Sequence, residues 1–251
     1  MKIGLIGTGE IGGTIAKKLT AAGHNVKVNN SSSPEELNKK AAELGVIPAT
    51  LKEVVKDVEV IIFSVPTTVF PTLPKDLLSE VSKDVIIVDT SNYYPFRDGD
   101  IEDLNNGKVE SIWVSEHLGR PVIKAFNNLL AHTLAVGGVN SADEERIAMA
   151  ISGDDTSAKE IVSSLVKDAG FDPVDAGKLS DSWRHQPGTP AYCTELNAAE
   201  LEKALDDGIK ENAGALRNNA IAKLIQRTTP PSHEEVVNFN RSMFPENPKT
   251  T

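Results

Sequence analysis

The sequence predicts an α/β fold with a doubly wound, mainly parallel sheet and a C-terminal helical and irregular extension. Short apolar runs, which suit buried parallel strands, recur along the first part of the chain. These runs are Lys2–Ile6, Asn25–Asn29, Val58–Val65, Val85–Asp89, Val122–Phe126, Ile147–Ser152 and Asp172–Asp175. The segments between these runs have apolar residues at helical spacing, for example Ile11, Ile15 and Leu19, which recur four residues apart. Because strands alternate with helices, we expect one parallel sheet covered on both faces.

Composition narrows the class of protein. The chain has 251 residues, of which 39% are hydrophobic and 25% charged, and its net charge is −10. An acidic surface repels phosphate backbones and anionic lipids, so we expect neither nucleic acid nor a membrane as a partner. The one cysteine, Cys193, excludes an internal disulfide, and no apolar run has the roughly 20 residues that a bilayer span needs. We therefore expect a cytoplasmic protein.

The character of the chain changes after the last predicted strand. Residues 1–178 form the expected nucleotide-binding domain. Residues 179–251 form an appendage that we expect to complete the site or a homodimer interface. Within it, Ala198–Gln226 has a helical composition, whereas Thr228–Thr251 is polar, contains four prolines and indicates a tail.

A glycine motif follows the first strand directly and opens the first helix. It reads Gly7-Thr8-Gly9-Glu10-Ile11-Gly12. Gly7 permits a tight turn, Gly9 lets the backbone approach a pyrophosphate, and Gly12 lets the helix pack close to the strand. The positive end of the helix then faces the phosphates. This context predicts a Rossmann fold that binds a dinucleotide.

The end of the second strand bears on the choice between NAD and NADP. An NAD enzyme usually has Asp or Glu there to bind the ribose 2′-hydroxyl. This chain has Asn30, Ser31 and Ser32 instead. An amide and hydroxyls are able to donate hydrogen bonds to a 2′-phosphate, and no acid is present to repel it. The run therefore favours NADP(H), although it lacks an arginine that would pair with the phosphate.

With these residues the chain resembles the coenzyme F420-dependent NADP oxidoreductases, whose nucleotide fold is similar to the cytosolic domain of the six-transmembrane ferric reductases. The shared segments span residues 1 to about 180. They are Gly7–Gly12, Ser64-Val65-Pro66, Lys124-Ala125-Phe126-Asn127, Ser152-Gly153-Asp154-Asp155 and Asp175-Ala176-Gly177-Lys178-Leu179-Ser180.

The resemblance implies hydride exchange between NADP(H) and a deazaflavin. It places Ser64, Val65 and Pro66 beside the nicotinamide, and Ala125, Phe126 and Asn127 on the loop that approaches it. Ser31 matches a position near the 2′-phosphate, but Ser32 stands where the family commonly has arginine.

The stretch Ser182–Cys193, with Ser91–Pro95, is similar to a bacterial subgroup of the family. Many bacteria do not make the deazaflavin. The small-molecule electron acceptor is then F420, another flavin such as FMN or FAD, or a small carbonyl compound.

The function that we expect is hydride transfer between NADP(H) and a flavin- or deazaflavin-type acceptor, and two alternatives remain open. Transfer to a flavin-type ring needs stacked planes and little acid–base help, with apolar walls near Val65, Pro66, Ala125 and Phe126. Reduction of a carbonyl or imine needs a proton donor. For that role we single out His185 and Tyr93, followed by Tyr94, Tyr192 and Lys124. The non-enzyme alternative is an NADP(H)-sensing module. No His/Cys/Asp cluster has metal-ligand spacing, so we expect no metal.

Overall fold

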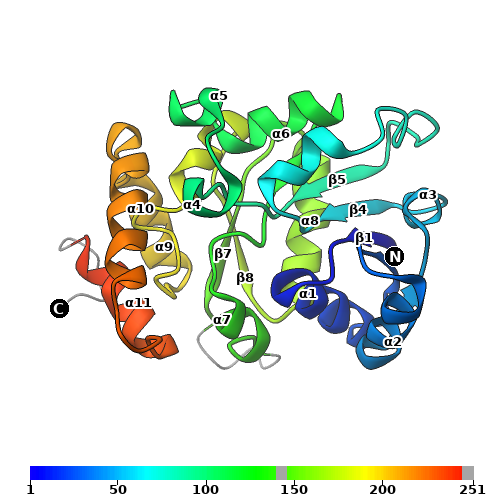
Figure 1. The fold of residues 1–251 in the computed structure, drawn as a ribbon, viewed down its shortest axis with the longest axis horizontal. Coiled ribbons are helices and arrows are strands. Elements are labelled where there is room, and N and C mark those ends of the chain that lie inside the picture. The colour runs from blue at the N-terminus through cyan, green and yellow to red at the C-terminus, as the bar shows by residue number, and fades with distance from the viewer. Residues whose placement is uncertain (140–145, 245–251) are drawn as a thin grey trace.

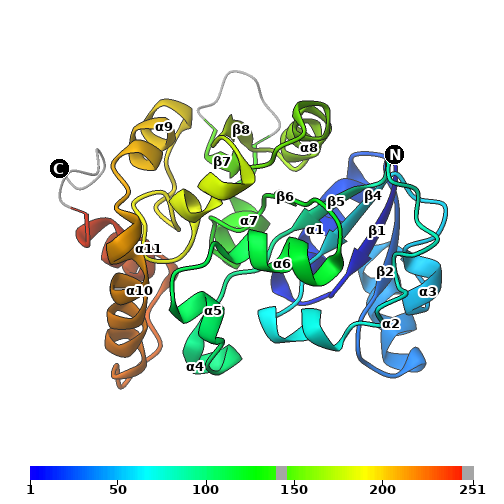
Figure 2. The ribbon, with the colours of Figure 1, turned by 90° about the horizontal axis from the view of Figure 1, so that it is seen from above.

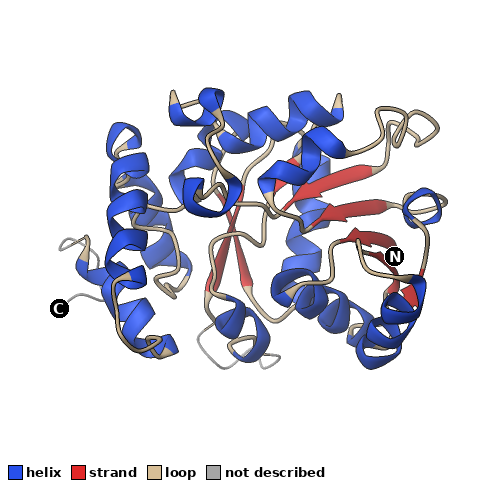
Figure 3. Cartoon of the chain, viewed as in Figure 1, coloured by secondary structure: helices blue, strands red, loops and turns tan. Residues whose placement is uncertain are grey.

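A computed structural model describes residues 1–139 and 146–244, and its main feature is a six-stranded parallel sheet (Figures 1 and 3). The strand order is β3-β2-β1-β4-β5-β6. The strands are β1 (Lys2–Ile6), β2 (Asn25–Asn29), β3 (Ile47–Pro48), β4 (Val60–Phe63), β5 (Ile86–Asp89) and β6 (Ile123–Lys124). The chain moves outward from β1 in one direction and then returns to β4 on its other side. This reversal creates the crevice where ligands bind in such sheets.

Helices cover both faces of the sheet, which confirms the predicted α/β fold. Those of the first 178 residues are α1 (Glu10–Ala21), α2 (Pro34–Leu44), α3 (Leu51–Val54), η1 (Thr67–Thr72), α4 (Pro95–Asp98), α5 (Glu102–Asn105), α6 (Glu110–Leu118), α7 (Ala131–Val136) and α8 (Thr156–Asp168). Alternate residues of β4 point to opposite faces. Ile62 packs in the core that contains α1, α2 and α8, whereas Ile61 and Phe63 pack in the core that contains η1 and α6.

The last two predicted strands do not join the main sheet as expected. β7 (Ala148–Ile151) and β8 (Asp172–Asp175) form a separate parallel pair, visible in Figure 3. Its link to the large sheet is a single antiparallel bridge between Lys124 and Ser152. At this bridge the chain runs antiparallel to β6, so β7 and β8 do not extend the parallel ladder of the large sheet.

The C-terminal part contains η2 (Leu179–His185), α9 (Ala198–Asp206), α10 (Lys210–Ile225) and α11 (His233–Ser242). The helices α9–α11 lie together, far from β1 (Figures 1 and 2). A third hydrophobic core joins this part to the second sheet, because Leu201 and Leu205 of α9 pack with Ala148 and Val174. The nucleotide-binding part and the extension therefore share a core.

The prediction of a polar tail over residues 228–251 is wrong for the middle of this segment, which forms α11. Ser232 and Glu235 cap the start of this helix reciprocally. Val237 is buried, and Asn240 donates to the carbonyl oxygen of Cys193 at 3.3 Å. Residues 245–251 lie outside the described part of the chain. Within residues 1–139 and 146–244, no helix combines the length and apolar character that crossing a bilayer requires.

Candidate active site

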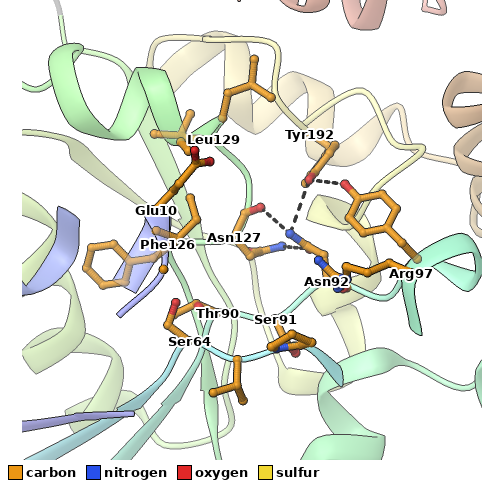
Figure 4. Close-up of a pocket in the computed structure, with 17 residues that line it drawn as sticks. Glu10, Ser64, Thr90, Ser91, Asn92, Arg97, Phe126, Asn127, Leu129 and Tyr192 are labelled. Carbon is orange, nitrogen blue, oxygen red and sulfur yellow. Dashed lines mark hydrogen bonds between the residues drawn. The ribbon is translucent and has the colours of Figure 1, made fainter. Parts of the chain in front are cut away.

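A cleft of about 350 Å³ opens at the carboxyl ends of β1, β4 and β5, where the strand order reverses (Figure 4). One end is formed by the glycine motif and the other by tyrosine, asparagine and arginine side chains. The cleft is lined by Gly9, Glu10, Ile11, Ser64, Val65, Pro66, Thr90, Ser91, Asn92, Tyr94, Arg97, Phe126, Asn127, Leu129, Leu130, Ala131 and Tyr192.

The glycines of the motif have three separate roles. A Cβ on Gly7, whose φ is +100°, would lie 2.1 Å from the carbonyl oxygen of Ser64, and a Cβ on Gly12 would lie 2.0 Å from the carbonyl oxygen of Gly7. A Cβ on Gly9 would meet nothing within 4 Å. Gly9 is also the N-cap of α1, and no side chain caps the first amides of that helix. Open space beside Gly9 and the uncapped backbone N–H groups of α1 therefore lie at the same place, as binding of a dinucleotide pyrophosphate requires.

The residues predicted near the 2′-phosphate lie at the end of β2, outside the cleft lining. Asn30 donates from Nδ2 to the hydroxyl of Thr8 at 2.7 Å, which ties this end to the glycine motif. The side-chain oxygen of Asn30 accepts from the backbone N–H and the hydroxyl of Ser32, at 3.0 and 2.6 Å. Both polar ends of Asn30 are therefore engaged, while Ser31 and Ser32 remain exposed.

The loops predicted beside the nicotinamide meet in the cleft. Ser64, Val65 and Pro66 follow β4, and Phe126 and Asn127 follow β6. Ala125 is fully buried and donates its N–H to the carbonyl oxygen of Asp89, so it lies behind the wall.

Sequence reasoning did not assign a cofactor role to Thr90, Ser91 or Asn92, which also line the cleft. Their position directly after β5 could have indicated this role, because the carboxyl ends of parallel strands meet at the same edge of the sheet.

Two asparagines at the tyrosine end of the cleft are joined to each other by reciprocal hydrogen bonds. Asn92 Nδ2 donates to the backbone oxygen of Asn127 at 2.9 Å, and Asn127 Nδ2 donates to Asn92 Oδ1 at 3.0 Å (Figure 4). Phe126 holds the preceding position in a left-handed conformation, which is uncommon for a bulky residue. Such strain clusters at functional sites, and here it points the backbone of Asn127 toward Asn92.

The three tyrosines divide between two environments. Tyr93 is fully buried, and its hydroxyl lies 2.9 Å from the carbonyl oxygen of Gly99, away from the cleft lining. Tyr94 and Tyr192 line the cleft, and their hydroxyl oxygens are 2.5 Å apart. Burial raises the pKa of both phenols, so both stay protonated at neutral pH. The cleft therefore contains the hydroxyls of Tyr94 and Tyr192 and not that of Tyr93.

His185 lies behind the cleft wall. It is fully buried, with Nδ1 at 2.8 Å from Asn127 Oδ1 and Nε2 at 2.9 Å from the hydroxyl of Ser152. Because an amide oxygen only accepts, Nδ1 carries the proton, and Nε2 accepts from Ser152. Burial lowers the pKa of His185 to about 3, so the ring is neutral. Both nitrogens are occupied, and the imidazole does not reach the cleft.

Lys124 lies beneath the cleft in a buried ion pair. Its ammonium is 3.0 Å from Asp89 Oδ2 and also donates to the carbonyl oxygen of Ser91. Asp89 accepts a further bond from the hydroxyl of Ser111 at 2.7 Å. The pair holds the loop after β5 in place. No group of three or more His, Cys, Asp or Glu side chains could hold a metal ion in the part of the chain that the structure describes.

The fold and the cleft define a dinucleotide-dependent oxidoreductase, and sequence comparison names its family. The model of the family described as "NADP oxidoreductase coenzyme F420-dependent" matches residues 2–93. YjhV of Escherichia coli (strain K12) is 37% identical over 98 residues, which cover 39% of this chain and 72% of that protein. The chain belongs to this family and is an NADP-dependent oxidoreductase.

Solved structures share the fold. SMa0349 from Sinorhizobium meliloti is 30% identical with a TM-score of 0.66, and the match covers 78% of this chain and 95% of that one. A protein from Arthrobacter sp. FB24, described as a candidate F420-dependent NADP-reductase, is 23% identical with a TM-score of 0.58. That match covers 72% and 87% of the two chains. At this identity the Arthrobacter protein shows the fold alone.

Proposed function

We propose that the protein reduces a small carbonyl or imine compound with NADPH. The observation that carries the proposal is the composition of one continuous cleft. Gly9 and the start of α1 form its nucleotide end, and the hydroxyls of Tyr94 and Tyr192 lie at its other end. Bound NADPH supplies a hydride. The chain supplies bare amides for the pyrophosphate, side-chain amides for orientation, and hydroxyl protons for the group that is reduced.

The size of the cleft supports a small substrate. Its volume of about 350 Å³ lies near the lower end of ligand pockets, which span roughly 300–1,000 Å³. The same cleft has to take the nicotinamide half of the dinucleotide. A small substrate is therefore the better match to this cleft.

A flavin- or deazaflavin-type acceptor is the second candidate, favoured by the description of the family and by the name of the Arthrobacter protein. Such a ring requires a stacking surface more than a proton donor. The apolar side chains of Val65 and Leu129 and the ring of Pro66 offer part of such a surface.

One experiment separates the candidates. NADPH oxidation is followed with aldehydes, ketones, cyclic imines, FMN, FAD and coenzyme F420. We expect turnover with at least one carbonyl or imine and little with the flavins. Turnover with F420, FMN or FAD alone would replace the proposal by the second candidate. Absence of NADPH binding by calorimetry would contradict both.

A further inference from the structure

We propose that Tyr192 is the proton donor of the reduction and that Tyr94 resupplies its proton. This inference rests on the proposed function, because hydride transfer to a carbonyl or imine leaves a basic oxygen or nitrogen that has to take up a proton. It assigns a catalytic role to a residue of the C-terminal part, in a cleft otherwise built from the nucleotide-binding part.

The hydrogen bonds around Tyr192 leave a proton available to a ligand. Tyr94 and Tyr192 carry two phenolic protons, and the bond of 2.5 Å between their oxygens uses one. Asn92 Nδ2 lies 3.4 Å from the Tyr192 oxygen and is able only to donate. When Tyr94 also donates, the oxygen of Tyr192 accepts twice and its own proton is left for the thiol of Cys193 or for a ligand. The thiol of Cys193 is a weak acceptor and a poor competitor for that proton.

The proton and electron balance is simple. The hydride of NADPH forms a bond to the carbonyl carbon, and the π electron pair of the C=O bond moves onto oxygen. That oxygen takes the proton of Tyr192, since an alkoxide is a stronger base than a phenolate. NADPH is oxidised to NADP⁺ and the carbonyl is reduced to an alcohol. An imine follows the same course, with nitrogen in place of oxygen.

The second half of the relay returns the proton. The Tyr192 phenolate takes the proton of Tyr94 along their hydrogen bond, and Tyr94 regains one from solvent. The guanidinium carbon of Arg97 lies 5.3 Å from the centre of the Tyr94 ring, so its charge stabilises the transient phenolate. Arg97 shares that charge with Asp98, and the side chain of Arg97 is 42% exposed, which places the end of the relay near water.

The surroundings keep both phenols protonated before the reaction. Burial is the main cause of the raised pKa of Tyr94, and the nearby Cys193 and Glu110 act in the same direction. Arg97 lowers the pKa of Tyr94 but by less than burial raises it. Both hydroxyls therefore carry their protons at neutral pH before the reaction.

The test uses single Tyr→Phe substitutions in the full-length protein, and the chain contains only three tyrosines. For a carbonyl or imine that the wild type reduces, Tyr192→Phe should lower kcat by about 10²–10⁴, the usual contribution of a positioned proton donor. Tyr94→Phe should lower it less, because water replaces the second step. Tyr93→Phe is the matched control, because its hydroxyl binds elsewhere, and it should leave kcat unchanged. NADPH affinity, measured by calorimetry, should stay the same in all three variants.

A second measurement does not depend on turnover. The proton shared by the two hydroxyls should give a downfield resonance in the ¹H NMR spectrum. It should vanish in Tyr94→Phe and in Tyr192→Phe and persist in Tyr93→Phe. Absence of this resonance in the wild type, or its persistence in either variant of the pair, would overturn the relay.

The outcomes distinguish the inference from the proposed function. A wild type that binds NADPH but reduces no carbonyl or imine refutes the function. A wild type that reduces one, with Tyr192→Phe equally fast, refutes only the proton donor.

Discussion

The imidazole of His185 donates from Nδ1 to the side-chain oxygen of Asn127 across 2.8 Å, so a buried neutral histidine orients an amide of the cleft wall. Asn127 in turn donates to Asn92, which lies 3.4 Å from the hydroxyl of Tyr192. A chain of hydrogen bonds thus runs from the interior to the acceptor end of the cleft. Protonation of His185 would remove the acceptor that Ser152 uses at Nε2.

The neutral state of His185 predicts a dependence of stability on pH. Its pKa is lowered to about 3 in the folded protein, whereas an unfolded histidine has a pKa of about 6.5. Between these values the unfolded chain binds a proton that the folded protein refuses. The free energy of unfolding should therefore fall by up to about 1.4 kcal/mol for each pH unit as the pH drops through this window.

Urea unfolding of the wild type and of His185→Gln across this pH range measures the effect. The variant should be less stable near neutral pH by about 1–3 kcal/mol, because two hydrogen bonds are lost, but its stability should change less with pH. The other histidines are common to both proteins and cancel in the difference. Parallel curves would show that His185 does not titrate as described.

Gly9→Ala should weaken NADPH binding at least about tenfold without unfolding the protein. A methyl group there meets nothing of the protein within 4 Å, but it occupies the space left for the pyrophosphate. Calorimetry measures the affinity, and circular dichroism checks the fold. Gly214→Ala on α10 is the control and should leave the affinity intact, since its nearest contact is at 4.0 Å and lies outside the cleft. Equal NADPH affinity in Gly9→Ala would place the pyrophosphate elsewhere.

Ser31→Asp should shift the cofactor preference toward NADH. Ser31 is exposed at the end of β2, and a carboxylate there would repel the 2′-phosphate and accept from a ribose hydroxyl. We expect the ratio of NADPH to NADH affinity to fall by about tenfold or more, equivalent to ~1.4 kcal/mol. Ser31→Ala removes the hydroxyl without adding charge and should have a smaller effect. A constant ratio in Ser31→Asp would exclude this position from the 2′-phosphate site.

Lys124→Met should destabilise the protein by about 3–5 kcal/mol, because it leaves Asp89 charged and fully buried. Chemical denaturation measures the loss. Adding Asp89→Asn to Lys124→Met removes the uncompensated charge and should restore part of the stability. A loss below about 1 kcal/mol in the single variant would mean that water or another cation reaches Asp89.

The nucleotide half of the site could be predicted because local constraints define it. The glycine spacing reflects the positive φ of Gly7 and the close approach of Gly12 to the carbonyl oxygen of Gly7, both encoded within a few residues. The main strands were equally readable from their apolar runs.

The acceptor half could not be predicted in the same way, because distant contacts decide it. Tyr94 and Tyr192 are 98 residues apart, and nothing local indicates that their hydroxyls meet. The same holds for His185, whose partner Asn127 lies 58 residues away. The separation of β7 and β8 from the main sheet depends on the antiparallel bridge between Lys124 and Ser152, and the apolar runs of the strands do not indicate it. For α11 a local signal did exist, since Ser232 and Glu235 have the spacing of a capping box.

Tyr192 enters the cleft from the loop between η2 and α9, whereas the amides for the dinucleotide come from the first turn of the chain. The two ends of the cleft thus come from stretches of sequence that are far apart in the chain. Relatives that keep the opening turn and replace the loop would retain the reductant and change what is reduced. Exchanging this loop between two relatives would replace Tyr192 and leave the first turn of the chain unchanged.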